Sequence, residues 1–206
     1  MNDYLAACLA LPKPTGLLGR GFPRSSWDAL PTTRWTKETR VDYRWDLIVR
    51  YAFAIPTDAA IRALAKLSPI VEIGAGRGYW AHLLRVAGAD VLAFDTYPLR
   101  YAESGWWRPG MGEPWTEVLR GGPERAGRYP DRTLLLIWPP MSDMAERALR
   151  ACRGSTVAYV GEGDGGCTGD RAFHAALERD WRVEREVSLP QWWGIHDDLT
   201  IYRRKP

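Results

Sequence analysis

The sequence predicts an α/β fold with a doubly wound, mostly parallel seven-stranded sheet, and three observations support this fold class. A short apolar run, Ile70–Ile73, leads into a glycine turn and then a helical pattern. Strand patterns then alternate with helical patterns, which favours parallel strands covered by helices on both faces. The last two strands, at Val183–Leu189 and Leu199–Arg203, have no helix between them, so we expect a terminal antiparallel hairpin.

The N-terminal third predicts a helical extension of the sheet domain. Met1–Leu11 has a helical pattern, and an irregular arm rich in Pro and Gly follows it. Apolar residues recur at helical spacing over Lys37–Ile55, and Thr57 is placed to cap a second helix at Asp58–Leu67. We expect residues 1–68 to form an arm and helices that lie as a lid near the carboxyl edge of the sheet, and residues 69–206 to form the sheet domain.

The remaining elements follow in chain order. A second strand is expected at Val91–Asp95, and the Gly-, Pro- and Trp-rich stretch from Thr96 to Trp115 reads as a loop. Further strands and helices are expected at Trp115–Leu119, Thr133–Trp138, Ser142–Ala151, Thr156–Gly161 and Asp170–Glu178.

The glycine turn indicates a ligand edge and excludes two common ligand classes. Its spacing is Gly-x-Gly-x-Gly, and glycines at alternate positions let a ligand approach the main chain closely. The third glycine of a dinucleotide fingerprint is replaced by Tyr79, which disfavours a bound pyrophosphate. No Gly-Lys-Ser/Thr follows, so the nucleoside triphosphate loop is also excluded.

An acid before the turn, Glu72, and an acid closing the second strand, Asp95, complete a recognisable pattern. With them the chain resembles the class I S-adenosylmethionine-dependent methyltransferases over about two-thirds of its length. The resemblance implies the strand order 3-2-1-4-5-7-6, with Asp95 on the ribose hydroxyls and Glu72 orienting the loop or binding the ammonium group. It implies cofactor contacts at Glu72, Gly74, Ala75, Gly76, Gly78, Tyr79, Trp80, Asp95, Thr96, Trp138 and Pro139.

Four segments are expected to meet at the carboxyl edge of the sheet, where open parallel sheets bind ligands. One of these segments contains Pro139-Pro140. Amino-methyltransferases carry Asn, Asp or Ser before the two prolines, whereas this chain carries Trp138 there. This replacement argues against nucleobase methylation, although the prolines could simply end a strand. Candidate substrate residues at this edge are Trp106, Trp107, Trp192, Trp193 and Glu162, with packing against the arm as the alternative for the last two tryptophans.

His196 is the candidate general base, because imidazole titrates near neutral pH and Asp197 or Asp198 could fix its tautomer. The alternative is a hydrogen-bonded histidine of the hairpin. Methyl transfer needs little acid or base help, since aligning the nucleophile, the methyl group and the sulfur supplies most of the rate.

Net charge, cysteine spacing and the lack of long apolar segments reduce the number of possible functions further. The net charge is only +3, and acids dilute the basic N-terminal arm, which disfavours nucleic-acid binding. Three separated cysteines indicate neither disulfides nor a metal site, and no signal peptide or membrane span is evident, so we expect a cytoplasmic protein. The sequence therefore predicts methyl transfer from S-adenosylmethionine to a small molecule in an aromatic-lined pocket. The alternatives are a nucleic-acid methyltransferase and a non-catalytic S-adenosylmethionine-binding partner protein.

Overall fold

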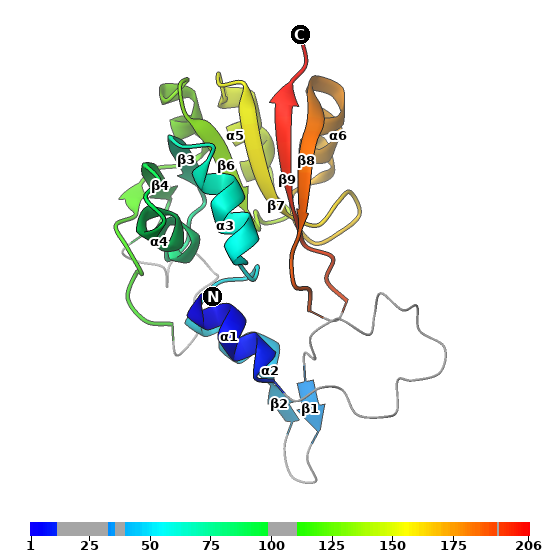
Figure 1. The fold of residues 1–206 in the computed structure, drawn as a ribbon. Helices are drawn as coiled ribbons and strands as arrows, with labels where there is room; N and C mark the ends of the chain where they lie inside the picture. Colours follow the sequence, from blue (N-terminus) through cyan, green and yellow to red (C-terminus); the bar gives the residue numbers. More distant parts are fainter. Residues whose placement is uncertain (12–32, 36–39, 99–110, 193) are drawn as a thin grey trace.

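A seven-stranded sheet lies at the centre of the protein, with helices on both of its faces (Figure 1). The computed structural model describes residues 1–11, 33–35, 40–98, 111–192 and 194–206. Within these residues no helix is both long and apolar enough to cross a bilayer.

The order of the strands confirms the predicted sheet. Six strands of this sheet point in one direction, and the last strand in the sequence, β9, lies antiparallel between β7 and β8. Counted along the sheet domain, this is the order 3-2-1-4-5-7-6. Across the sheet the strands are β5 (Leu119–Arg120), β4 (Val91–Asp95), β3 (Ile70–Ile73), β6 (Thr133–Ile137), β7 (Thr156–Gly161), β9 (Asp198–Arg204) and β8 (Trp181–Ser188).

Two apolar cores explain why both faces are covered. Every residue of β3 is buried, as expected for a central parallel strand. One core joins its first face to α1 (Asp3–Leu9), α2 (Tyr43–Arg50), α3 (Asp58–Ala65) and α4 (Tyr79–Val86). The other joins the opposite face to η3 (Pro123–Arg128), α5 (Met144–Ala151) and α6 (Arg171–Asp180).

The N-terminal helices begin where the sequence provides caps. The Asn2 side chain accepts a hydrogen bond from the Leu5 N–H at 2.9 Å, and Thr57 Oγ1 accepts one from the Ala60 N–H at 3.1 Å. Tyr4 and Cys8 of α1 are buried in the same core as Trp80 of α4. The first residues of the chain therefore pack directly against the sheet domain.

Two predicted elements differ from the structure. The helix expected over Lys37–Ile55 is limited to α2, because residues Arg40–Asp42 form strand β2 and pair with strand β1 (Thr33–Trp35). The strand expected at Trp115–Leu119 is reduced to β5, since the Trp115 ring packs against the rings of Tyr51 and Tyr79 instead of joining the sheet. In both places a contact distant in the sequence overrides the local pattern.

The start of α4 offers a test of the fold. Gly78 is the N-cap of α4 with φ +74°, and a Cβ there would lie 2.8 Å from Val118 Cγ2. Gly88 has φ +85° but nothing within 4 Å of a Cβ. We expect Gly88→Ala to cost about 1–2 kcal/mol of unfolding free energy, because its backbone is left-handed. Gly78→Ala should cost a further ~1–3 kcal/mol for the steric clash. Urea unfolding of the two variants measures the difference, and equal losses would contradict the described packing around Gly78.

Candidate functional site

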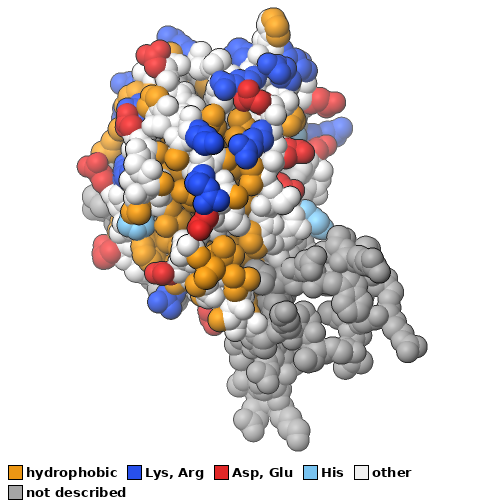
Figure 2. All heavy atoms as spheres, in the orientation of Figure 1, with side chains coloured by type: hydrophobic (Ala, Val, Ile, Leu, Met, Phe, Trp, Pro, Cys, Tyr) orange, Lys and Arg blue, Asp and Glu red, His pale blue; other side chains and the backbone are white. Residues whose placement is uncertain are grey.

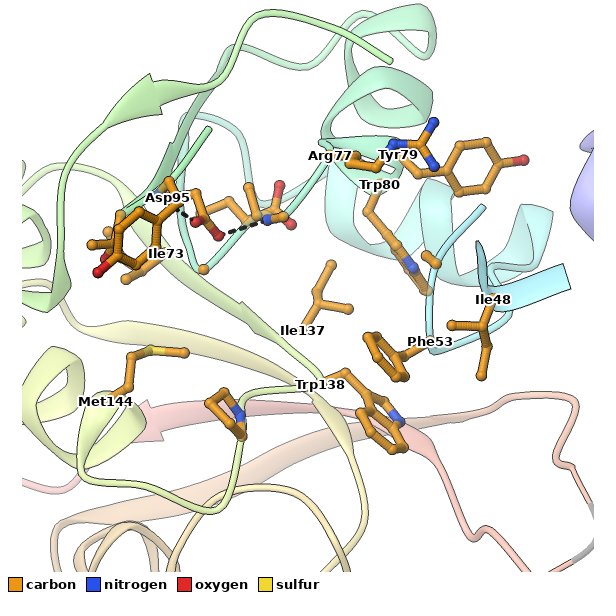
Figure 3. Close-up of a pocket in the computed structure, with 18 of the residues that line it drawn as sticks. Ile48, Phe53, Ile73, Arg77, Tyr79, Trp80, Asp95, Ile137, Trp138 and Met144 are labelled. Carbon is orange, nitrogen blue, oxygen red and sulfur yellow. Dashed lines mark hydrogen bonds between the residues drawn. The ribbon is translucent and has the colours of Figure 1, made fainter. Parts of the chain in front are cut away.

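A cavity of about 250 Å³ opens at the carboxyl edge of β3, β4 and β6. Its lining comes from the glycine turn and Asp95 at one end, and from Ile48, Phe53 and Trp138 at the other. Figure 3 shows Asp95 on one side and Ile48, Phe53 and Trp138 on the other, with Ile137 between them. The cavity therefore joins the predicted cofactor residues to an apolar end.

The glycine turn is held in a shape that side chains would obstruct. Gly74, Gly76 and Gly78 have φ values of +76°, +56° and +74°, in the left-handed region that favours glycine. A Cβ on Gly74 would lie 2.9 Å from Met144 Cε of α5. The Gly74 and Ala75 N–H groups both donate to the Phe94 carbonyl, at 2.8 and 3.0 Å. Because Gly74 and Gly76 carry no side chain, their main-chain atoms line the cavity directly.

The carboxylate of Asp95 supports the turn and still has acceptor capacity. It accepts hydrogen bonds from the Gly76 N–H and the Tyr97 N–H, each at 2.9 Å. A carboxylate has about four acceptor positions, so ribose hydroxyls can still bind. Burial raises the pKa of Asp95, although the N–H groups of Tyr97, Gly76 and Thr96 partly oppose this effect. Thr96 lines the cavity beside it.

Glu72 is the most unusual group of the site. Its side chain lines the cavity and is 2% exposed, and its Oε2 has no hydrogen-bond partner among the described residues. Burial raises its pKa to about 8; the positive Arg85 opposes the rise and the negative Asp95 adds to it. A buried carboxyl oxygen without a donor is costly, so a donor from a ligand would relieve that cost.

Arg77 within the turn and the two residues that follow it, Tyr79 and Trp80, attach the turn to neighbouring segments. The Arg77 guanidinium donates to the Val49 carbonyl at 2.8 Å and to the Glu113 carbonyl at 2.9 Å. Tyr79 packs against Trp115, and the Trp80 indole donates to the Ala54 carbonyl at 3.2 Å. All three residues line the cavity. The glycine turn and the N-terminal segment bonded to it therefore form one wall of the cavity.

Trp138 forms the wall at the apolar end. Its ring stacks on Phe53 with centroids 4.7 Å apart and planes 9° apart. Its indole N–H points to both oxygens of Asp197, at 2.8 and 2.9 Å. Pro139 is buried and its carbonyl accepts a bond from the Gly169 N–H at 2.9 Å, while Pro140 lines the cavity.

The two predicted catalytic residues have different partners from those expected. The His196 side chain is 79% exposed, and its Nδ1 lies 3.3 Å from Glu162 Oε1. Asp197 is buried and faces Trp138, so the acid beside the imidazole is Glu162. Burial raises the pKa of Asp197 to about 7, while the indole hydrogen bond opposes the rise. Neither His196 nor Asp197 lines the cavity.

Glu162 connects two loops at the carboxyl edge. Its carboxylate accepts hydrogen bonds from the Cys167 N–H and the His196 N–H, each at 2.8 Å. Burial would raise its pKa, but the hydrogen bonds from Cys167 and His196 outweigh burial and hold the pKa below its usual value. Glu162 therefore organises the loop after β7 and the turn before β9, and Cys167 of this loop lines the cavity.

The structure describes one of the four predicted substrate tryptophans, Trp192. Trp192 is 1% exposed in the core that contains Tyr4, and it does not line the cavity. Trp106, Trp107 and Trp193 lie outside the described residues. Among the described residues no three His, Cys, Asp or Glu side chains gather to hold a metal ion.

Several lining residues were not predicted from the sequence. They are Ile48, Tyr51, Ala52, Phe53, Arg77, Tyr97, Met111, Pro140, Met144 and Cys167, together with Gly121, Gly122 and Pro123 after β5. The helical spacing around Ile48 indicated a buried face, but no pattern indicated that this face meets the sheet edge.

The raised pKa of Glu72 predicts a pH dependence of stability. An acid whose pKa is about 8 when folded and 4.5 as a free side chain binds more protons in the folded state between these values. Stability of the ligand-free protein should therefore fall as pH rises from about 5 to 8, by at most ~4 kcal/mol for this group.

We expect Glu72→Gln to flatten this fall in urea unfolding measured across the pH range. Asp90→Asn is the control, because Asp90 is exposed and beside Arg132, whose hydrogen bond lowers the Asp90 pKa. An unchanged slope for Glu72→Gln would show that the carboxyl is not buried as described.

Comparisons with known proteins found similarity to solved structures and to no family model or curated protein. The sheet order with a reversed last strand is that of the class I S-adenosylmethionine-dependent methyltransferase fold.

Solved structures similar to the chain include those of three methyltransferases. A tRNA (uracil-54, C5)-methyltransferase of Pyrococcus abyssi in complex with S-adenosyl-L-homocysteine is 15% identical over 70% of this chain, with a TM-score of 0.46. The match spans only 37% of that protein's length. An rRNA methylase from Streptococcus thermophilus is 18% identical, with a TM-score of 0.47, over 74% of this chain and 98% of that one. Magnesium protoporphyrin IX methyltransferase of Synechocystis with bound cofactor is 12% identical, with a TM-score of 0.47, over 71% of this chain and 76% of that one.

Proposed function

We propose that the protein transfers a methyl group from S-adenosylmethionine to a small molecule held in the cavity. One observation carries the proposal: Glu72, which has a buried oxygen without a partner among the described residues, lines one cavity together with the glycine turn and Asp95. This set of groups suits a ligand that has an ammonium group and vicinal hydroxyls. A sheet edge that lacked these groups would offer no acceptor for the ammonium group or for the hydroxyls.

The residues present fit this cofactor. The glycine turn would hold its methionine portion, Glu72 its ammonium group, and Asp95 its ribose hydroxyls through the lone pairs that the backbone leaves unused. When bound, the cofactor supplies an electrophilic methyl group on a sulfonium. Asp95 supplies an acidic group at this end of the cavity, and an ammonium group beside Glu72 would favour the ionised form of that carboxyl, so the pair suits a cationic ligand.

The contribution of the chain is positioning. Tyr79, Trp80 and Trp138 present aromatic walls that exclude water, and the hydrogen bonds of Arg77 hold α2 against the turn. We propose the N-terminal helices as a lid on this basis, since Ile48 and Tyr51 line the cavity. His196 does not line the cavity, so we propose it as a general base only for a hydroxyl acceptor that extends beyond the lining residues toward the turn before β9, with Glu162 as the acid that orients its imidazole.

Cofactor binding can be tested by calorimetry. We expect S-adenosylmethionine and S-adenosylhomocysteine to bind, and NAD and ATP not to bind. Asp95→Asn should weaken the binding by about ten-fold or more, because a charged acceptor for two hydroxyls is lost. Asp90→Asn, an exposed acid just before the same strand, should bind as the unmodified protein does. Equal affinity for Asp95→Asn, in a variant that unfolds at the normal temperature, would remove the assigned site.

The acceptor class can be tested by methyl transfer. The protein is incubated with methyl-labelled cofactor and separate pools of metabolites, tRNA, DNA and protein. We expect label in the metabolite pool. Label found only in tRNA or DNA would replace the small-molecule proposal with nucleic-acid methylation. Absence of transfer to every pool, in a protein that binds the cofactor, would indicate a binding protein without catalysis.

A further inference from the structure

Phe53 and Trp138 form a pair of parallel rings at the apolar end of the cavity. Both residues line the cavity, and their planes are 9° apart. Figure 3 shows Phe53 between Trp138 and the middle of the cavity. A flat molecule in the cavity would therefore continue an existing stack of rings.

Trp138 is fixed in place from several directions. It has φ +50°, an uncommon conformation for a residue with a side chain, which persists only where the surroundings enforce it. Its backbone N–H donates to the Val160 carbonyl at 2.8 Å, and its indole N–H donates to the buried Asp197 carboxylate. The Arg44 guanidinium lies over the ring, 5.8 Å from its centroid. Phe53 is therefore backed by a rigid ring.

The apolar end carries no charged side chain among the described residues that line it, which are Ile48, Tyr51, Ala52, Phe53, Ile137 and Trp138. The charged lining residues of the described chain are Glu72, Arg77 and Asp95, and they belong to the glycine turn and its neighbouring strands. Burying an unpaired charge is costly, so this end favours an uncharged ligand. A cationic acceptor would in addition be repelled by the sulfonium of the proposed cofactor.

We propose that the apolar end binds the methyl acceptor as a flat, uncharged aromatic ring of a small molecule, stacked on Phe53. This inference rests on the proposed methyl transfer, because it names the acceptor class of the same cavity. Trp138 and Asp197 act as positioning residues: Asp197 holds the indole, and the indole holds Phe53 parallel to the incoming ring. An aliphatic acceptor would gain from burial but would not gain from parallel ring stacking.

The test compares matched probes on protein saturated with S-adenosylhomocysteine. The pairs are naphthol with decahydronaphthol and phenol with cyclohexanol, which share a carbon skeleton and differ in aromaticity. We expect the aromatic member of each pair to bind about 3- to 10-fold more tightly, as measured by calorimetry. Phe53→Leu should remove this preference while keeping an apolar side chain, and Phe53→Tyr should retain it.

A second pair of variants tests the positioning residues. Asp197→Asn keeps a carbonyl acceptor for the indole and should keep most of the preference, whereas Asp197→Leu should lose it. Equal affinity for the two members of each pair, or a preference that survives Phe53→Leu, would overturn the stacking proposal. The stacking proposal would also be overturned if the aromatic probes failed to bind a protein that still binds S-adenosylhomocysteine.

The same titrations distinguish failure of the proposed function from failure of the acceptor class. Loss of S-adenosylhomocysteine binding by the unmodified protein would reject the proposed function itself rather than the acceptor class. A short oligoribonucleotide added as a competitor should leave naphthol bound. Displacement of naphthol by the oligoribonucleotide would assign the ring to a nucleobase and overturn the small-molecule acceptor.

Discussion

The hydrogen bond from the Gly76 N–H to the Asp95 carboxylate is the contact on which the rest of the site depends. It joins the turn after β3 to the end of β4, and two further N–H groups of this turn, from Gly74 and Ala75, reach the Phe94 carbonyl. Because these donors are satisfied within the sheet edge, hydrogen bonds inside the protein hold the turn with its left-handed glycines. The cavity is therefore formed in advance, which lowers the entropy lost when a ligand binds.

The walls of the cavity come from parts of the chain that are far apart in sequence. Arg77 donates to the Val49 carbonyl at the end of α2, and Trp80 donates to the Ala54 carbonyl. These bonds place Phe53 opposite the glycine turn. The cofactor end is thus built mainly from local sequence around β3 and β4, whereas the apolar end requires the N-terminal segment to dock on the sheet.

This division explains what could be predicted from the sequence. The terminal hairpin followed from local patterns and the sheet order from the family resemblance that the motifs carry, and both are confirmed by the strand pairing. The partners of Trp138 and His196 could not be predicted, because the Trp138–Asp197 contact spans 59 positions and the His196–Glu162 contact spans 34. Similarly, the helical period around Val41 gave no indication that this residue would pair with Arg34 in a strand.

The buried acids at this edge differ in the donors that the chain provides, and this difference separates structural acids from ligand-binding ones. Glu162 receives two backbone N–H groups, so its pKa stays low despite burial, and its charge is used within the fold. Among the described residues Asp197 receives only the Trp138 indole, and burial brings its pKa to about 7. Glu72 has an oxygen without any donor in the same part of the chain, and burial brings its pKa to about 8. A ligand that supplies a donor to this oxygen would favour the ionised form of Glu72, so cofactor binding and ionisation of Glu72 should be coupled.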